Sequence, residues 1–147
     1  MVKLYTRYGI IIAIILIAYF LLLKLIGLHQ YPVLSAANGV IFGVGILLVL
    51  KTYKASQSRF EYQKGFQLGF FTGGLATILF VTFMAFYMYQ LDTEFSQNIL
   101  DSWQLNYESG TFMILISLFI MGLATSMVLT LAFMQLLKQS WNTTKAL

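Results

Sequence analysis

Three glycines recur at every fourth position in the stretch KGFQLGFFTGG, which covers residues 64–74. Glycine beside lysine occurs in phosphate-binding loops, but a Walker loop reads G-x-x-x-x-G-K-[ST] and follows a strand. Here Lys64 precedes the glycines, and the dinucleotide pattern G-x-G-x-x-G is also missing. A spacing of four instead places Gly65, Gly69 and Gly73 on one helix face, where small residues let two helices approach closely in lipid. The stretch is therefore predicted to be a helix-packing surface.

Similar rows of small residues occur in two other apolar segments. Gly39 and Gly43 share one helix face, and Gly122 and Ser126 share another. The predicted helix-packing positions are thus Gly39, Gly43, Gly65, Gly69, Gly73, Gly122 and Ser126. We expect these faces to pack within one chain, because the helices of one chain must first pack on one another, and packing between chains is the alternative.

Few polar side chains interrupt the apolar segments. Lys24 lies four residues before the end of the first segment, so its amine either reaches the membrane interface or pairs with an outer carboxylate, Asp92 or Glu94. Asn38 is expected to form an interhelical hydrogen bond, and the alternative is that it lines a solute path. His29 is the only histidine, and one histidine is too few for a metal site.

The residue types that most catalytic sites require are missing or scattered. The chain has no cysteine, which excludes thiolate catalysis, disulfides and thiolate metal sites. None of the five carboxylates lies within an apolar segment, and no nucleophile–base pair or ligand cluster is apparent. The sequence therefore predicts neither an enzyme nor a cofactor.

Composition indicates a membrane protein. Of the 147 residues, 59% are apolar and 10% are charged, against about 45–50% and about 25% in soluble domains. Apolar runs long enough to span a bilayer cover residues 8–28, 33–50, 66–89 and 111–137. The runs are continuous rather than alternating, which favours helices over barrel strands. We predict an all-α fold: one transmembrane domain over residues 1–147, an antiparallel four-helix bundle.

The basic residues predict how the chain is threaded. Eight of the nine lysines and arginines lie at the termini or in the second connection, and Lys24 is the exception. Because cytoplasmic loops collect lysine and arginine, both termini are predicted to be cytoplasmic. The predicted location is the bacterial cytoplasmic (inner) membrane. No basic tract is long enough to predict a nucleic-acid partner.

The third connection is predicted to contain a short amphipathic helix. Its apolar residues fall four apart, at Leu91, Phe95, Ile99 and Trp103, and Asp92 is a candidate N-cap. Such a helix lies on the outer membrane interface. A lid or a partner-docking arm is the alternative.

The segment from about Lys51 to Asp101 resembles a family of small bacterial membrane proteins designated a domain of unknown function. The resemblance is carried by KTYKASQSRFEYQKGFQLG, which enters the third apolar run, and by YQLDTEF, which leaves it. The family pattern often has a proline after the aspartate, where this chain has Thr93. The resemblance implies a four-helix bundle and implies no activity.

Packing faces without catalytic groups favour a non-catalytic subunit or scaffold that acts through helix–helix contacts. The alternative is a small channel or transporter for a neutral or apolar solute, with Asn38 in its path. The predicted partners are the lipid bilayer and, through the helix faces, other membrane proteins or further copies of this chain.

Overall fold

A computed structural model of the chain describes residues 1–28, 31–102 and 109–138. The regular structure of these residues is entirely helical, and four helices are long and apolar enough to cross a membrane. These observations confirm the all-α prediction with four candidate spans. The elements are α1 (Val2–Leu25), α2 (Pro32–Ser56), α3 (Tyr62–Phe86), the π-helical turn η1 (Tyr87–Leu91), α4 (Thr93–Ser102) and α5 (Gly110–Leu137).

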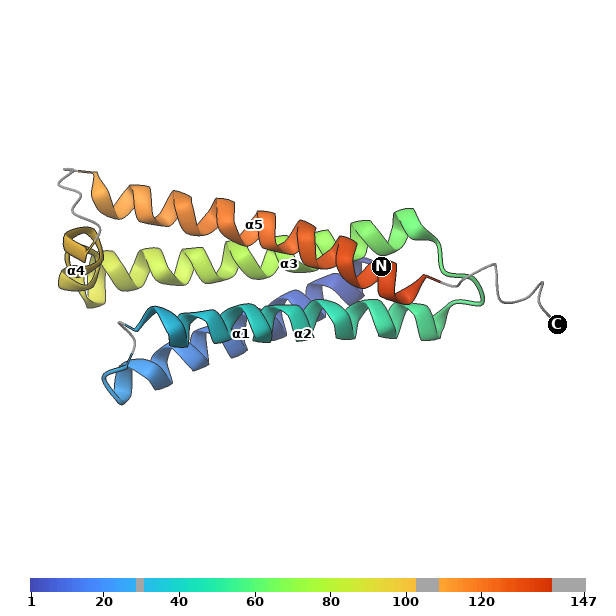
Figure 1. Cartoon of the computed structure of the whole chain (residues 1–147), viewed down its shortest axis with the longest axis horizontal. Helices are drawn as coiled ribbons and strands as arrows, with labels where there is room; N and C mark the ends of the chain where they lie inside the picture. The colour runs from blue at the N-terminus through green and yellow to red at the C-terminus, as the bar shows by residue number, and fades with distance from the viewer. Residues whose placement is uncertain (29–30, 103–108, 139–147) are drawn as a thin grey trace.

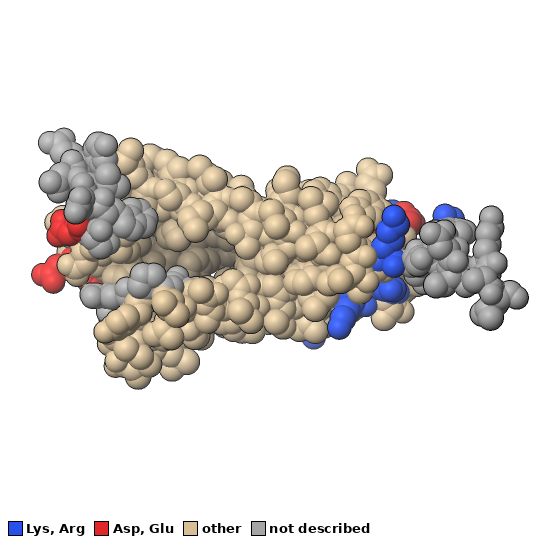
Figure 2. All heavy atoms as spheres, viewed as in Figure 1, with Lys and Arg blue, Asp and Glu red and all other residues tan. Residues whose placement is uncertain are grey.

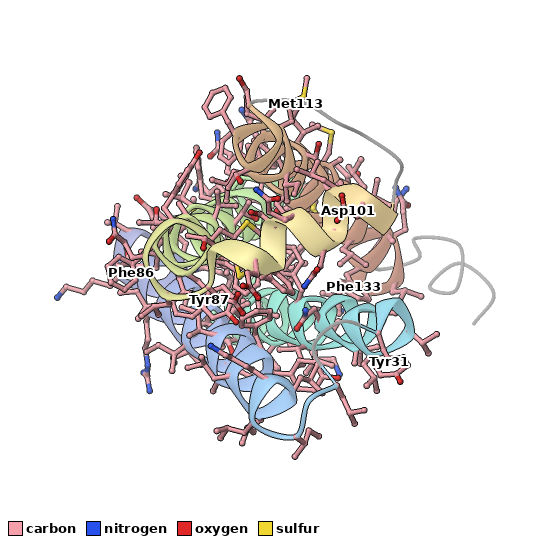
Figure 3. All side chains as sticks on the ribbon, turned by 90° about the vertical axis from the view of Figure 1, so that its left-hand side faces the viewer. Tyr31, Phe86, Tyr87, Asp101, Met113 and Phe133 are labelled. Carbon is pink, nitrogen blue, oxygen red and sulfur yellow. The ribbon has the colours of Figure 1, made fainter. Side chains whose placement is uncertain are left out.

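The four long helices form one bundle around α3. Consecutive long helices run in opposite directions, so the start of α1 and the end of α5 lie at the same end (Figure 1). Helix α3 packs on α1, α2 and α5, whereas α1 and α5 lie at opposite corners (Figure 3). Charged side chains gather at the two ends of the bundle and leave the sides apolar (Figure 2). We call the end with residues 51–64 the basic end and the end with α4 the acidic end.

The α1–α2 connection contains a glycine-terminated helix end. Gly27 has φ +72°, its N–H donates to the carbonyl of Lys24 at 3.0 Å, and the N–H of Leu28 donates to Leu23 at 2.8 Å. This pair of bonds is a Schellman motif, in which glycine adopts the left-handed conformation without steric cost. Helix α1 therefore ends at Leu25, three residues before the approximate end predicted for the first span. The prediction that Pro32 opens the second helix is confirmed.

At the basic end the helices continue beyond the predicted apolar runs. Helix α1 begins at Val2, α2 reaches Ser56 and α3 begins at Tyr62. Apolar composition marks where lipid begins, but backbone hydrogen bonding continues through the polar turns beyond it. A side-chain hydrogen bond connects α2 and α5 at this end: Lys54 Nζ donates to the carbonyl of Leu137, the last residue of α5, at 2.9 Å.

The third predicted span is not a single α-helix. After Phe86 the backbone widens, and the N–H of Asp92 donates to the carbonyl of Tyr87 at 2.9 Å, a five-residue spacing. The π-helical turn η1 places two consecutive large side chains, Tyr87 and Met88, in the protein interior. The predicted span over 66–89 is borne out, since α3 and η1 together form one candidate span over Tyr62–Leu91. The π-helical turn was not predicted, because hydropathy does not distinguish it from an α-helix.

Buried side chains form two clusters along the bundle axis. The first fills the half toward the basic end and includes Ile12, Leu16, Phe42, Ile46, Val49, Leu50, Tyr53, Leu68, Ala76 and Met134. The second fills the acidic end and contains Phe20, Met84, Tyr87, Met88, Phe95, Ile114 and Leu115. Phe80 is half-buried and packs against both clusters. The bundle thus has two separately packed regions, with Phe80 between them.

Candidate functional site

The glycine stretch 64–74 lies in α3, and two of its glycines face α5. A Cβ on Gly69 would lie 2.5 Å from Thr130, and one on Gly73 would overlap Ser126. One turn further along, the glycine is on α5 and the hydroxyl side chain is on α3: a Cβ on Gly122 would overlap Thr77. The Ser126 hydroxyl also donates to the carbonyl of Phe70 across the interface at 3.3 Å. Each of these glycines faces a small hydroxyl side chain, which brings the two helices into close contact within one chain.

The other predicted packing glycines are placed differently. A Cβ on Gly43 would make ordinary contacts with Leu129 and Phe133 of α5, each at 3.7 Å. Gly65 faces the ring of Phe60, so it accommodates the α2–α3 connection rather than a neighbouring helix. A Cβ on Gly39 would meet nothing within 4 Å. Within this chain, Gly39 and Gly65 therefore do not pack against a neighbouring long helix, and packing of these faces between chains stays a prediction.

Two other glycines make close contacts between the long helices. A Cβ on Gly45 of α2 would overlap Ile12 of α1, and one on Gly9 of α1 would lie 3.1 Å from the Thr72 carbonyl. Gly45 was missed because it lies outside the four-residue row of α2. Its position two residues after Gly43 was the only signal in the sequence.

A cavity of about 150 Å³ lies beside the α3–α5 contact and is lined by all four long helices. Leu16 of α1 and Phe80 of α3 form apolar walls from the two core clusters. Its polar lining includes Asn38 of α2 and Thr77 of α3. The lining contains no ionisable side chain among the described residues. The cavity is therefore apolar with a few neutral polar groups.

Two residues that line this cavity each have a buried oxygen atom without a hydrogen-bond partner among the described residues. These atoms are Asn38 Oδ1 and Thr77 Oγ1. Thr77 is only 4% exposed, and an unpaired buried polar group costs about 1–3 kcal/mol. Other threonines of α3 avoid this cost, since Thr72 donates to the carbonyl of Leu68 at 2.7 Å and Thr82 donates to that of Ile78 at 2.8 Å. The interhelical hydrogen bond predicted for Asn38 therefore does not engage its Oδ1 atom.

The cavity opens sideways between α2 and α5. Figure 2 shows the opening as a hollow between the two helices, in the half of the bundle toward the acidic end. Gly39 on one side and Met121 on the other are both exposed, and Met121 is 64% exposed. The side of a membrane-spanning bundle faces lipid, so a molecule dissolved in the bilayer reaches this opening directly.

The acidic end is closed by α4, which lies across it (Figure 3). Asp92 caps α4, because its Oδ1 accepts from the N–H of Phe95 at 3.0 Å, which confirms the predicted N-cap and short helix. Of the predicted apolar face, Phe95 and Ile99 lie in α4, Leu91 belongs to η1, and Trp103 lies outside the described residues. The Oδ2 atom of Asp92 accepts from the Tyr87 hydroxyl at 3.0 Å. The Tyr87 ring meets Phe20 and Phe95 edge-on, with centroids 5.0 and 5.6 Å away. The Asp92 carboxylate and the rings of Phe20, Tyr87 and Phe95 thus hold α4 against α1 and η1.

Lys24 is joined to this cluster in a way that neither sequence interpretation anticipated. Its Nζ lies 4.5 Å from the centre of the Tyr87 ring, a cation–π contact. It forms no ion pair with a described carboxylate. The expected link to Asp92 is therefore indirect and runs through the tyrosine between them. His29 lies outside the described residues.

No group of three or more described His, Asp or Glu side chains could hold a metal ion. The chain also matches no protein-family model, no curated protein and no solved structure. The resemblance to a bacterial family of four-helix membrane proteins therefore stays a prediction. The laterally open cavity is the feature of the described residues that points most directly to a function.

Proposed function

We propose that this chain is a non-enzymatic transport protein that binds a small, uncharged, largely apolar solute in the cavity between α2, α3 and α5. The observation that supports the proposal is the laterally open cavity itself, whose polar lining residues include Asn38 and Thr77 and whose described lining has no ionisable side chain. The lateral opening admits a solute that already partitions into the bilayer. Neither polar residue is a general base, which is why we propose binding rather than chemistry.

Blocking the cavity is expected to abolish solute binding without unfolding the protein. Gly39 lines the cavity, and a Cβ there meets nothing within 4 Å, so leucine fits on the backbone and fills the opening. We expect Gly39→Leu to lose saturable binding of 4-fluorotoluene, measured by ligand-observed fluorine NMR in lipid nanodiscs. Its melting temperature should stay the same or rise, because leucine has higher helix propensity than glycine. Val40→Leu, at the neighbouring exposed position, is the control and should bind normally.

We also propose the bacterial cytoplasmic membrane as the location, with both termini in the cytoplasm. In support, the described lysines and arginines other than Lys24 lie at the basic end, and Asp92, Glu94 and Asp101 lie at the other. A reporter enzyme that is active only outside the cytoplasm should be inactive when fused after Leu147. The same reporter fused after Asn98 of α4 should be active. The reverse pattern would overturn the proposed orientation.

A non-catalytic subunit or scaffold is the second candidate. It is favoured by the large apolar side chains that α5 exposes along its length, among them Phe112, Ile120 and Val128. It is weakened by the contacts of Gly69, Gly73 and Gly122, which are occupied within the chain. The mass of the intact assembly, extracted gently from native membranes, distinguishes the two candidates. A mixed complex would support the subunit function, whereas a monomer or homo-oligomer would favour the transport function.

A further inference from the structure

The basic end of the bundle carries exposed cations on two neighbouring helices, α1 and α2. We propose that this surface binds anionic phospholipids, with Arg7 of α1 and Lys51 of α2 each holding the headgroup of one lipid. Both side chains are exposed, and each residue lies more than one turn inside its helix. The inference is independent of the proposed solute function, because it concerns the outer surface of the bundle rather than the cavity.

Arg7 and Lys51 belong to the same layer of the bundle. The residues that follow them are joined, since the Tyr8 hydroxyl oxygen and Thr52 Oγ1 lie 2.9 Å apart across the α1–α2 contact. Each cation is one residue from this bond, an advance of about 1.5 Å along its helix. Figure 2 shows the lysines and arginines of this end as a band beside the apolar sides of the bundle. The band therefore lies where an apolar surface gives way to a polar one.

The two cations have no counter-charge in the part of the chain that the structure describes. Glu61 is the carboxylate described at this end, and its Oε2 lies 2.8 Å from Lys64 Nζ. Lys54 is also engaged, since it donates to the carbonyl of Leu137. Arg7 and Lys51 form no such ion pair with a described residue. Exposed cations without an internal partner attract anions from outside the protein.

Exposed apolar side chains continue from each cation toward the middle of the bundle. On α1, Ile11 and Ile14 lie four and seven residues after Arg7, on the same helix face, and both are exposed. On α2, Leu48 lies three residues before Lys51 on the same face and is also exposed. A phospholipid presents the same order of groups, a phosphate followed by hydrocarbon. This arrangement favours a membrane lipid over a soluble anion.

The chemistry of the two side chains favours a headgroup with a net negative charge. The guanidinium group of arginine matches two phosphate oxygens, and the ammonium group of lysine acts as a point charge. Phosphatidylcholine also contains a phosphate, but its quaternary ammonium group cancels the charge. Phosphatidylglycerol keeps its negative charge. One lysine or arginine at an anionic membrane surface strengthens association about fivefold, so each site should prefer phosphatidylglycerol by about that factor.

Native mass spectrometry of the full chain in detergent micelles tests the proposal. Phosphatidylglycerol and phosphatidylcholine with chains of different mass are added in equal amounts, and the lipids bound per protein are identified as their concentration rises. At least the first two lipids bound should be phosphatidylglycerol, with about fivefold preference for each. The preference should weaken as the ionic strength rises. Equal binding of the two lipids would overturn the proposal.

Substitutions assign the preference to the two cations. Arg7→Gln and Lys51→Gln should each bind one phosphatidylglycerol fewer with preference, and the double variant should bind two fewer. Glu61→Gln combined with Lys64→Gln removes an ion pair from the same end without changing the net charge, so it should bind as the unmodified chain does. Lys24→Gln loses one charge at the acidic end and should also leave the preference unchanged.

Three results would contradict the proposal in different ways. An unchanged preference in the double variant of Arg7 and Lys51 would show that other residues hold the lipid. Equal losses in Lys24→Gln and Arg7→Gln would show that net charge alone causes the preference. Displacement of phosphatidylglycerol by inorganic phosphate, beyond that by chloride at equal ionic strength, would show that the sites bind a free anion instead of a lipid.

Discussion

Replacing Gly73 with leucine is expected to force α3 and α5 apart and to lower the melting temperature of the protein in detergent. A side chain at this position overlaps Ser126, and its Cβ already comes within 3.2 Å of the Phe42 ring. Neither neighbour can move freely, because Ser126 and Phe42 are both buried. Overpacking of this kind costs about 1–3 kcal/mol or more, and loss of the Ser126–Phe70 hydrogen bond adds about 1 kcal/mol.

Gly39→Leu is the matched control for this experiment, since it makes the same change on a helix face with open space. A compensating change provides a second control. Gly73→Ala should destabilise the protein less than Gly73→Leu, and adding Ser126→Gly should recover part of that loss, because the serine side chain is the main obstacle. Equal melting temperatures for Gly73→Leu and Gly39→Leu would contradict the close contact between α3 and α5 at Gly73.

Replacing Tyr87 with alanine is expected to release α4 from the acidic end and to destabilise the whole bundle. The Tyr87 side chain is completely buried, and truncating a large buried side chain costs about 3–5 kcal/mol. The substitution also removes the donor to Asp92 Oδ2 and the ring beneath Lys24. Melting temperature and hydrogen exchange of the α4 amides measure the effect. Exchange in α4 should rise well above that in the centre of α3.

Two substitutions separate the contributions to this effect. Tyr89→Ala removes the same side chain from a 52% exposed position two residues away and should have little effect on stability. Tyr87→Phe keeps the ring and removes only the hydroxyl, so it should cost about 1 kcal/mol. Equal protection of α4 in Tyr87→Ala and Tyr89→Ala would contradict the role of Tyr87.

Composition and periodicity were sufficient to predict the helices, because long apolar runs and residues spaced four apart are properties of the chain alone. They also predicted the α4 helix and its Asp92 cap. Gly39 and Gly73 show the limit. Both belong to rows of small residues, yet one faces open space and the other faces Ser126. The contacts of a helix face depend on the neighbouring helix. The spacing of residues along one helix carries no information about that neighbour.

The same limit applies to the cavity. Asn38 was identified as a candidate because an amide is unusual in an apolar span. Thr77 was not, because threonine in a helix usually donates to its own backbone, as Thr72 does. The structure distinguishes the two threonines: Gly122 packs against Thr77, whose hydroxyl oxygen has no hydrogen-bond partner among the described residues. The π-helical turn was missed for a similar reason, since hydropathy does not show that Tyr87 and Met88, two consecutive residues, are both buried.

The central position of α3 has a consequence for the order in which the protein is assembled during translation. Helix α1 leaves the ribosome first, but its close contact through Gly9 is with Thr72 and Leu75 of α3. That partner is synthesised only after α2 and the connection that follows it. The α1–α2 hairpin must therefore wait in the insertion machinery or in lipid, held by contacts such as Gly45 against Ile12, until α3 arrives.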